Sequence, residues 1–521
     1  MKKLIFFHGL LLSLLILLTG CGDNSSPTGS GTSSSPASGQ RQFVWNAMNY
    51  WYYWQSDVPE LADNHQHFSS DQAFQDYLKG FANPDSLFQS LRYKPGNVDQ
   101  FSYFIPDYKK YNNQNKGIYA ALGFNYGYVV LADHYTVIGY VQYIVPGSPA
   151  DSAGLKRGTV FWKVDGNKLN VNNYQQYLRD DQSPHTLTLA KVQNNTIVQT
   201  DSTVTIQSRK LTEDPVFYHT VIDTSNTKIG YLVYNAFQTN SHKELNKVFG
   251  TFASKGINTL ILDLRYNGGG SLLTSEVLGS MISGKGPSDE FAELSYNSKR
   301  SSLNSKIYFL NKVPIANSNG TFDTNSQGDY TNTIPMNKLS INNVYILISQ
   351  STASASEALI NALKPYMNVT LVGTKTIGKN HGEITLYDEP KDAATPPYTD
   401  VNKANPNTKF ALAPLIFKIT NKNHNDYPNG FKPDIKVDEV NYLGNLPPLG
   451  SLKDPLVSKA ISQITGGQTT TAQSRANLTR HGQFQGTFLK DNRDLRPHGK
   501  EMNIPSVMLK KIAQRKKVAP H

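Results

Sequence analysis

The sequence has little of several residue types on which whole classes of protein depend. It contains 1 cysteine in 521 residues, which excludes a disulfide scaffold and any zinc or iron–sulfur site built on clustered cysteines. Charged residues account for 17% of the chain, which excludes a coiled coil. No apolar run reaches the roughly 18–20 residues of a permanent membrane-spanning helix. Neither the His-Glu-x-x-His pattern of zinc peptidases nor a Gly-Lys-Ser/Thr phosphate loop occurs, so we expect no metal and no cofactor.

The chain does contain enough apolar material for several packed cores. Hydrophobic residues make up 38% and aromatic residues 11%, and 521 residues correspond to two to four domains at about 100–200 residues each. The net charge of +11 is concentrated at the end, because residues 468–521 hold eleven basic and three acidic residues. The body of the chain has no basic recognition helix or aromatic–basic sheet motif, so nucleic-acid binding is not expected.

The first 21 residues have the pattern of a targeting signal. Two lysines precede the apolar stretch Leu4–Leu18, which has the length of a signal peptide. It ends in Leu18-Thr19-Gly20-Cys21, which resembles the bacterial lipobox. This resemblance implies a lipoprotein signal peptide (1–21), acylation of Cys21, and a lipid-anchored protein of the bacterial cell envelope, facing the periplasm or the surface. An ordinary secretory signal with a chance cysteine is the alternative. Residues 22–40, rich in Ser, Gly, Thr and Pro, predict a flexible linker.

The next two regions differ in pattern. Residues 41–112 are rich in aromatic residues and predict a small helical N-terminal domain, with helices near Trp45–Trp54 and Asp71–Phe81. Most of these aromatic residues are expected to pack in its core, and a ligand-stacking surface is the alternative. Residues 113–210 predict strands separated by turns.

Residues 113–210 contain, in this order, an apolar strand, a Pro-Gly turn, a short helix starting at Ser148-Pro149 and a strand Val160–Val164. This order resembles a PDZ domain of bacterial proteases, and Leu122-Gly123-Phe124 stands where such a domain has its carboxylate-binding loop. Backbone N–H groups at a glycine turn can bind a C-terminal carboxylate, while the sheet edge adds the peptide as a strand.

Residues 211–465 predict two βαβ units with parallel strands. The expected strands are Ile229–Phe237, Thr259–Leu264, Val344–Ser349 and Val369–Gly373, and the expected helices are His242–Lys255, Leu272–Ile282, Ser356–Leu363 and a closing helix in 450–464. Residues 466–521 predict a basic, disordered tail that is dispensable for catalysis, because the segment cannot build a core of its own. A short basic amphipathic helix over Ser506–Lys517, lying on anionic lipid, is the alternative.

Right-handed connections bring the carboxyl ends of parallel strands to one edge of the sheet, where α/β proteins bind ligands. Ser354 follows one predicted strand and Lys379 follows the next, 25 residues later. The glycine loop Gly268–Gly270 leaves a third strand at the same edge. We therefore expect Ser354, Lys379 and the backbone N–H groups of this loop to lie close together.

Three motifs resemble those of the carboxyl-terminal processing proteases, the tail-specific serine–lysine endopeptidases. They are Asp263–Gly270, Thr352–Glu357 and Gly378-Lys379, and the resemblance covers about residues 41–465. It implies that Ser354 is the nucleophile, that Lys379 is the general base, and that the oxyanion donors are the N–H groups of Gly269 or Gly270 and of Ala355. The implied architecture is multidomain α+β and α/β, with a helical N-terminal domain, a PDZ-like β domain and a ClpP/crotonase-like βαβ peptidase core. The implied activity is endopeptidase cleavage of protein or peptide substrates held through their C-termini.

One position departs from the pattern of this family. Four residues after the lysine, its best-known members have a Gln, whereas this chain has Glu383. A carboxylate there could orient the ammonium, although it would also favour the protonated form. Alternatively, a different residue positions the lysine, Glu383 points away, or His381 shares or replaces the role of base. Two other readings remain: a catalytically silent PDZ lipoprotein, and a tricorn-like Ser–His peptidase for which His219 or His242 would supply the histidine.

Overall fold

The computed structural model describes residues 36–178, 183–224, 226–317, 320–389, 397–467, 484–495 and 499–518. The predicted signal peptide, Cys21 and all but the last residues of the predicted linker lie outside these ranges, so the predictions made for them stay predictions. Among the described residues, no helix is long and apolar enough to cross a membrane.

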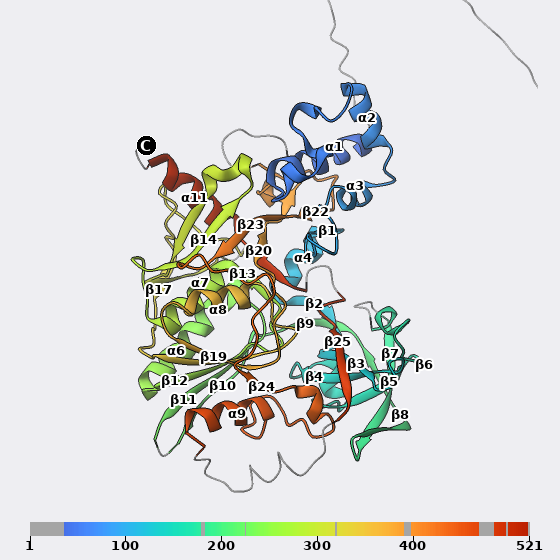
Figure 1. Cartoon of the computed structure of the whole chain (residues 1–521), viewed down its shortest axis with the longest axis vertical. Helices are drawn as coiled ribbons and strands as arrows, with labels where there is room; N and C mark the ends of the chain where they lie inside the picture. The colour runs from blue at the N-terminus through green and yellow to red at the C-terminus, as the bar shows by residue number, and fades with distance from the viewer. Residues whose placement is uncertain are drawn as a thin grey trace, which may run out of the picture.

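A small helical domain forms the N-terminal part of the molecule (Figure 1). Its aromatic side chains pack inward, since Trp51, Tyr52 and Phe74 are fully buried. The hydroxyl of Ser70 caps the second helix by accepting a hydrogen bond from the Ala73 N–H at 3.1 Å. The helices are α1 (Pro36–Trp51), η1 (Gln55–Asp57), η2 (Pro59–Leu61), η3 (Asp63–His65), α2 (Asp71–Lys79), α3 (Pro84–Ser90) and α4 (Tyr108–Gln114).

The central sheet has six strands in the order β10-β11-β12-β18-β19-β24, and all pairs except β10–β11 are parallel. The predicted βαβ units are confirmed, with boundaries that shift by at most a few residues. The strands are β10 (Val216–Asp223), β11 (Lys228–Tyr234), β12 (Thr259–Asp263), β18 (Asn343–Ile348), β19 (Asn368–Gly373) and β24 (Ile435–Lys436).

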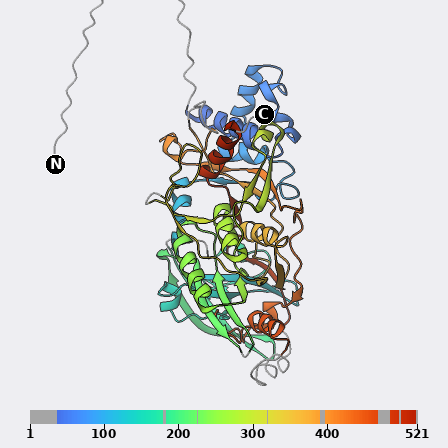
Figure 2. The same ribbon diagram turned by 90° about the vertical axis from the view of Figure 1, so that its left-hand side faces the viewer.

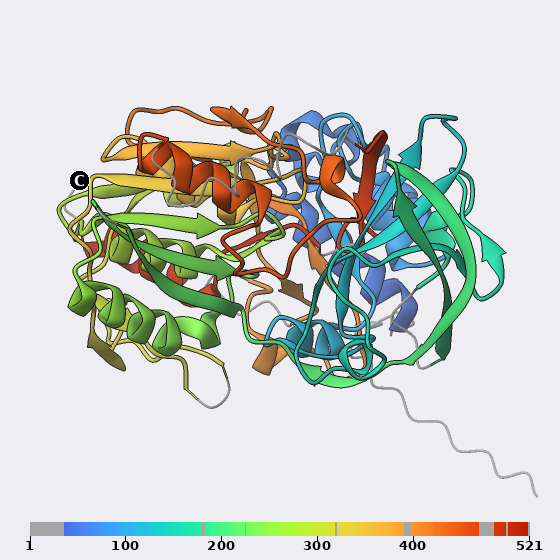
Figure 3. The same cartoon turned by 90° about the horizontal axis from the view of Figure 1, so that it is seen from below.

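Helices cover both faces of this sheet (Figure 3). On one face, α6 (His242–Lys255), α7 (Leu272–Ser283) and α8 (Ala355–Leu363) bury apolar side chains against the strands. On the other face, α9 (Pro455–Ile464) contributes Leu456 and Val457 to a separate buried cluster. Because both faces are covered, the strands are apolar along nearly their whole length, as the sequence predicted.

A second sheet of six strands lies next to the carboxyl edge of the first, in the order β13-β26-β20-β23-β14-β15. Its strands are β13 (Gly269–Ser271), β26 (Glu501–Asn503), β20 (His381–Glu383), β23 (Leu415–Thr420), β14 (Glu290–Tyr296) and β15 (Ser305–Tyr308). Smaller elements nearby are β1 (Tyr103–Ile105), β21 (Leu386–Tyr387), β22 (Ala411–Ala413), β16 (Lys312–Pro314), β17 (Thr333–Pro335), η5 (Thr239–Ser241), η6 (Ser298–Leu303), η7 (Val401–Lys403) and η8 (Glu439–Tyr442).

The β domain is built on a strongly bent sheet that lies beside the central sheet (Figures 1 and 3). The predicted strand Val160–Val164 is present, and Ser148 caps the predicted short helix by accepting from the Asp151 N–H. Its elements are β2 (Ile118–Ala121), β3 (Phe124–Leu131), β4 (Val137–Ile144), α5 (Pro149–Ser152), β5 (Val160–Val164), β6 (Asn167–Lys168), η4 (Tyr174–Gln176), β7 (Pro184–Gln193), β8 (Thr196–Gln207) and β9 (Arg209–Thr212).

The end of the chain differs from the disordered tail that the composition predicted. It forms β25 (Gly486–Asp491) on the β domain, β26 in the second sheet and α11 (Ser506–Val518), which contacts η6 and lies at the same end of the molecule as the N-terminal helices (Figures 1 and 2). Met502 and Leu509 are fully buried. The segment has too few apolar residues for its own core, but it completes sheets and clusters built by other parts of the chain. The predicted end of the peptidase core at residue 465 is therefore wrong.

Candidate functional site

The carboxyl ends of three neighbouring parallel strands carry the residues singled out in the sequence. β12 leads into the glycine loop, β18 is followed by Ser354, and β19 is followed by Lys379. One carboxylate holds the last two segments together, because Glu357 Oε2 accepts the backbone N–H of Ser354 and that of Lys379, both at 2.9 Å. The backbones of Ser354 and Lys379 thus meet on one carboxylate, although their side chains are not hydrogen-bonded to each other.

Ser354 has an unusual backbone conformation at the start of α8, with φ 64° and ψ −116°. A non-glycine residue reaches such angles only at a cost of about 1–3 kcal/mol, and residues of this kind cluster at functional sites. Its side chain is fully buried, and its Oγ has no hydrogen-bond partner among the described residues. The hydroxyl is therefore available for chemistry rather than for capping the helix.

The glycine loop passes directly over Ser354. A Cβ atom added to Gly269 would lie 2.9 Å from the Ser354 Cβ and 3.0 Å from the Ala355 nitrogen, so a side chain at this position would clash. The φ values of 109° at Gly269 and 134° at Gly270 also favour glycine. The Gly269 N–H is already used, since it donates to Asn267 Oδ1 at 2.9 Å. Of the two predicted glycine donors, Gly270 is thus the one whose N–H makes no hydrogen bond within the loop itself.

Lys379 is fully buried and contacts two oxygen atoms, neither of which belongs to Ser354. Its Nζ donates to Glu383 Oε2 at 2.6 Å and to the Lys500 carbonyl at 2.7 Å. The alternative that Glu383 points away is wrong. Glu383 also accepts from the Met502 N–H at 2.9 Å, so the same carboxylate holds both the lysine and β26.

The acidic groups around the lysine are shifted toward their neutral forms. Burial raises the pKa of Glu383, against the lowering effect of the Lys379 charge. Burial, and then the charge of Glu383, raise the pKa of Glu501 to about 8. Tyr103 donates its hydroxyl to Glu501 Oε1 at 3.3 Å. Lys500 and Glu501 lie in the predicted tail, and no sequence signal connected them with this site.

Glu357 is a further functional residue for which the sequence analysis proposed no role. Beyond the contacts with Ser354 and Lys379, its Oε1 accepts from Gly378 N at 2.7 Å and from Thr376 Oγ1 at 2.6 Å. Burial raises its pKa to about 7, although these hydrogen bonds favour the ionised form. The available signal was the Ser-x-x-Glu spacing of a capping box, which places a glutamate over the first turn of a helix.

None of the three candidate histidines has a recorded contact with Ser354. His381 packs against the rings of Tyr53 and Trp54, and burial lowers its pKa to about 4. His242 is enclosed between the Pro314 carbonyl at 2.7 Å and Thr274 Oγ1 at 2.9 Å, and burial lowers its pKa to about 4 as well. His219 lies on β10, beside a phenylalanine of α6.

A buried ion network lies under the glycine loop. Arg265 contacts Asp263 at 2.8 Å and Asp454 at 2.9 Å, and Arg157 of the β domain reaches Asp454 at 2.9 Å and also contacts Glu439. Burial opposes ionisation of Asp454, but the two guanidinium groups lower its pKa to about 2. Asp263 and Arg265 thus form a structural ion pair. The network also joins the β domain to the core.

Leu122, Gly123 and Phe124 join β2 to β3 as a tight, buried turn. Gly123 has φ 90°, and its carbonyl accepts from Ser148 Oγ at 3.0 Å and from the Val145 N–H at 2.9 Å. The carbonyl groups of the turn thus point toward the short helix α5, since the Leu122 carbonyl also accepts from the Ala150 N–H.

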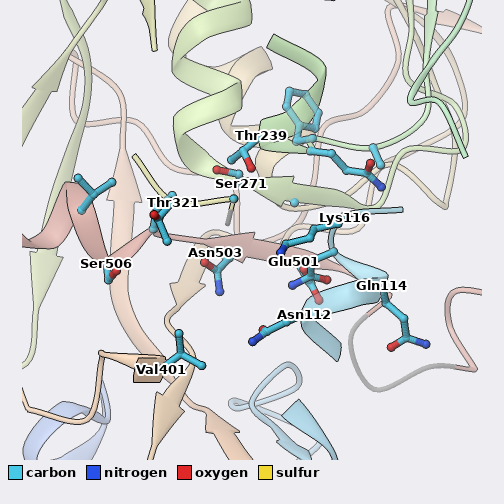
Figure 4. A pocket seen from close by; sticks show the side chains of 18 of the residues that line it. Asn112, Gln114, Lys116, Thr239, Ser271, Thr321, Val401, Glu501, Asn503 and Ser506 are labelled. Carbon is cyan, nitrogen blue, oxygen red and sulfur yellow. The ribbon is translucent and has the colours of Figure 1, made fainter. Parts of the chain in front are cut away.

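A cavity of about 580 Å³ opens beside the glycine loop (Figure 4). Its walls come from the N-terminal domain, from η5 and the glycine loop, and from the C-terminal segment. Figure 4 shows Lys116 and Asn112 on one side, with Ser271, Glu501 and Asn503 nearby. Polar and apolar groups contribute about equally to its walls, and the cavity adjoins the predicted oxyanion donors.

Comparisons with known proteins agree with this geometry. Residues 228–437 match the family described as Peptidase family S41, and residues 39–103 match the Peptidase S41 N-terminal domain. A "Probable CtpA-like serine protease" of Staphylococcus aureus (strain N315) is 23% identical over 302 residues, which cover 57% of this chain and 49% of that protein. A "Carboxyl-terminal-processing protease" of Picosynechococcus sp. is 27% identical over 276 residues, which cover 50% of this chain and 57% of that protein.

Among solved structures, the crystal structure of a "Putative S41 protease" from Bacteroides fragilis NCTC 9343 is 25% identical, with a TM-score of 0.59. The match covers 82% of this chain and 97% of that chain. By contrast, this chain spans about half the length of the curated relatives that it matches.

Proposed function

Because the chain belongs to peptidase family S41, we propose that it is a serine endopeptidase of the carboxyl-terminal processing type, with Ser354 as nucleophile and Lys379 as general base. The observation that carries this proposal is the shared carboxylate of Glu357, which fixes the backbone of both residues beneath the glycine loop. A serine hydroxyl needs such a base in order to become nucleophilic.

The reaction follows from this placement. The free amine of Lys379 takes the proton of Ser354 Oγ as this oxygen attacks the carbonyl carbon of the scissile peptide bond. The N–H groups of Gly270 and Ala355 stabilise the negative oxygen of the tetrahedral intermediate. The lysine then gives its proton to the leaving amine, and water hydrolyses the resulting ester by the same steps.

Lysine is protonated at neutral pH in water, since its ordinary pKa is about 10.4, so the mechanism needs a setting that favours the free amine. In this structure Lys379 is fully buried and its Nζ is bound to the Glu383 carboxylate. The contacts of Lys379 with Glu383 and the Lys500 carbonyl must therefore loosen before the lysine can reach Ser354.

The proposal also assigns roles to the β domain and to Cys21, and a fold to the core. The β domain acts as a PDZ domain that holds the C-terminal part of a protein substrate, with Leu122-Gly123-Phe124 as its carboxylate-binding turn. The core belongs to the ClpP/crotonase-like folds. Cys21 carries the lipid that anchors the protein in the bacterial cell envelope. A silent binding protein is disfavoured because Ser354 and Lys379 are both retained, and a Ser–His mechanism is disfavoured because no candidate histidine contacts Ser354.

The test is the incubation of purified protein with an unstructured polypeptide, followed by mass spectrometry of the products. Ser354→Ala should abolish cleavage, because it removes the nucleophile. Ser351→Ala is the matched control: this neighbouring hydroxyl is also buried and has no hydrogen-bond partner among the described residues, so its loss should leave cleavage unchanged. Equal cleavage by Ser354→Ala and wild type would refute the assignment.

A further inference from the structure

The C-terminal segment occupies the edge of the β domain as an added strand. β25 pairs antiparallel with β3, from Gly486 opposite Leu131 to Asp491 opposite Gly127, and the Asn492 N–H continues the ladder to the Tyr126 carbonyl at 3.0 Å. The segment therefore runs toward the Leu122-Gly123-Phe124 turn. This is the direction of a peptide that binds a sheet edge with its C-terminus at such a turn.

Side chains of the segment also fill the apolar surface next to this edge. Leu489 and Leu495 pack against the buried cluster that contains Phe124, Tyr126 and Leu178. Main-chain pairing together with apolar side chains in adjacent pockets is how strand addition gains affinity and selectivity. The edge that the proposed function assigns to substrate is thus filled by the protein itself.

The same segment then crosses the candidate catalytic residues. The Glu501 N–H donates to the Gly268 carbonyl at 3.1 Å, and β26 pairs in parallel with β13, Glu501 opposite Gly269. In a parallel ladder of this register, the Glu501 carbonyl accepts from the next N–H of β13, which is that of Gly270. A carbonyl oxygen of the segment therefore lies at the predicted oxyanion donor, and the preceding carbonyl, that of Lys500, holds Lys379.

From these contacts we propose that residues 484–495 and 499–503 are an intramolecular occupant of the substrate path, which must leave both the β3 edge and the glycine loop before a peptide can bind. The identification of the β3 edge and the glycine loop as the place where substrate binds rests on the proposed function. Ser354 and Lys379 are both fully buried in this state, so no substrate can reach them while the segment is bound. β26 also fills the gap between β13 and β20 and so closes the sheet across the site.

The C-terminal segment competes with an incoming peptide while it stays covalently attached to the same chain. A tethered segment has an effective concentration of the order of millimolar, so an incoming peptide competes with it only by better pairing or better side-chain contacts. Substrates with apolar residues in the positions of Leu489 and Leu495 should therefore be favoured. The apparent affinity of the full chain for any peptide is reduced by the fraction of molecules in which the path is open.

The test uses a fluorescent synthetic peptide with the sequence of residues 484–503 as probe. It is added to the full chain, to Leu489→Ser/Leu495→Ser, which weakens docking of the segment on the β domain, and to Asn492→Pro, which removes the N–H that pairs with the Tyr126 carbonyl. Thr487→Ser is the matched control, because this exposed side chain of β25 lies outside the apolar contacts. The two altered chains are independent routes to the open state, so failure of one to fold leaves the other decisive.

We expect the altered chains to bind the probe about tenfold more tightly than the full chain and the control. This factor corresponds to a substrate path that is open in about one-tenth of the wild-type molecules, because the apparent affinity is reduced by the open fraction. An unlabelled unfolded polypeptide should displace the probe, and the rate of polypeptide cleavage should rise in the altered chains. Equal probe affinity in all four chains would overturn the proposal, as would a bound probe that the polypeptide does not displace. Probe binding and displacement without cleavage in any chain would support this inference and would refute the proposed function.

Discussion

Replacing Glu383 with glutamine changes the charge next to the candidate base with almost no change of shape. The Glu383 carboxylate lies 2.6 Å from Lys379 Nζ, and both side chains are fully buried. A glutamine oxygen could still accept from the Met502 N–H, as Oε1 of Glu383 does at 2.9 Å. Its amide N–H could donate to a neutral amine, whereas it would repel an ammonium. Glu383→Gln should therefore favour the free-amine form of Lys379.

The distance between Lys379 Nζ and the Glu383 carboxylate sets an upper bound on how far Glu383→Gln can move the pH profile. Two unit charges 2.6 Å apart interact with about 6 kcal/mol at an effective dielectric constant of about 20. Opposite charges in proteins shift titrations by about 1–3 pH units in practice, because desolvation and relaxation offset part of this energy. We expect the acidic limb of kcat/KM against pH to move to lower pH by about 1–3 units in Glu383→Gln.

The assay is peptide hydrolysis over a range of pH, with Glu383→Asp as the variant that keeps the charge. Both variants should be compared in the chain that carries Leu489→Ser/Leu495→Ser, so that release of the C-terminal segment does not contribute to the difference. An acidic limb that stays in place, or that moves to higher pH, would refute the reasoning. It would mean that the Glu383 carboxyl is neutral in the active state, or that Lys379 is not the base.

Lys379→Arg should be inactive in peptide hydrolysis, because a guanidinium does not deprotonate in a protein. The double variant Ser354→Ala/Lys379→Ala should hydrolyse peptides no more slowly than either single variant, since both residues act as one unit. Glu501→Gln should change the pH dependence of stability. In the folded state the pKa of the Glu501 carboxyl is raised from 4.5 to about 8, so the folded state binds more protons than the unfolded state between these two values. The wild type should therefore lose up to about 1.4 kcal/mol of stability per pH unit as the pH rises through that window. Thermal unfolding against pH should show this decline in the wild type and a weaker one in Glu501→Gln. Cys21→Ala should move the protein from the membrane fraction to the soluble fraction in a cell fractionation. Amidation of a substrate's C-terminus should raise KM if the Leu122-Gly123-Phe124 turn binds a carboxylate, and equal KM values for free and amidated peptides would contradict that role.

The central fold could be predicted because its signals are local. The helix His242–Lys255 begins after a serine and ends at Gly256 in a left-handed conformation, and its bounds match the prediction. The strands at the centre of the sheet are short apolar runs next to glycine or polar residues, which is how buried parallel strands read in a sequence. Ser354 and Lys379 could be placed together because right-handed βαβ units have only one arrangement of their strand ends.

The C-terminal segment could not be predicted in this way, because its structure depends on partners far away in the chain. β26 has only three residues, and its neighbours are Gly269–Ser271 and His381–Glu383. Such a strand has no hydrophobic period of its own, and the basic composition of residues 468–521 predicted a solvated tail. The contact of Lys379 with the Lys500 carbonyl depends on the same missing information, because the two residues lie 121 positions apart.

The identity of the nucleophile is tested most directly by covalent labelling. A peptidyl phosphonate ester transfers its phosphonyl group to an activated serine, and tandem mass spectrometry of the digested protein locates the adduct. The account predicts a single adduct on Ser354, formed faster in Leu489→Ser/Leu495→Ser than in wild type, and absent from Ser354→Ala. An adduct on another residue, or equal labelling of Ser354→Ala, would contradict it.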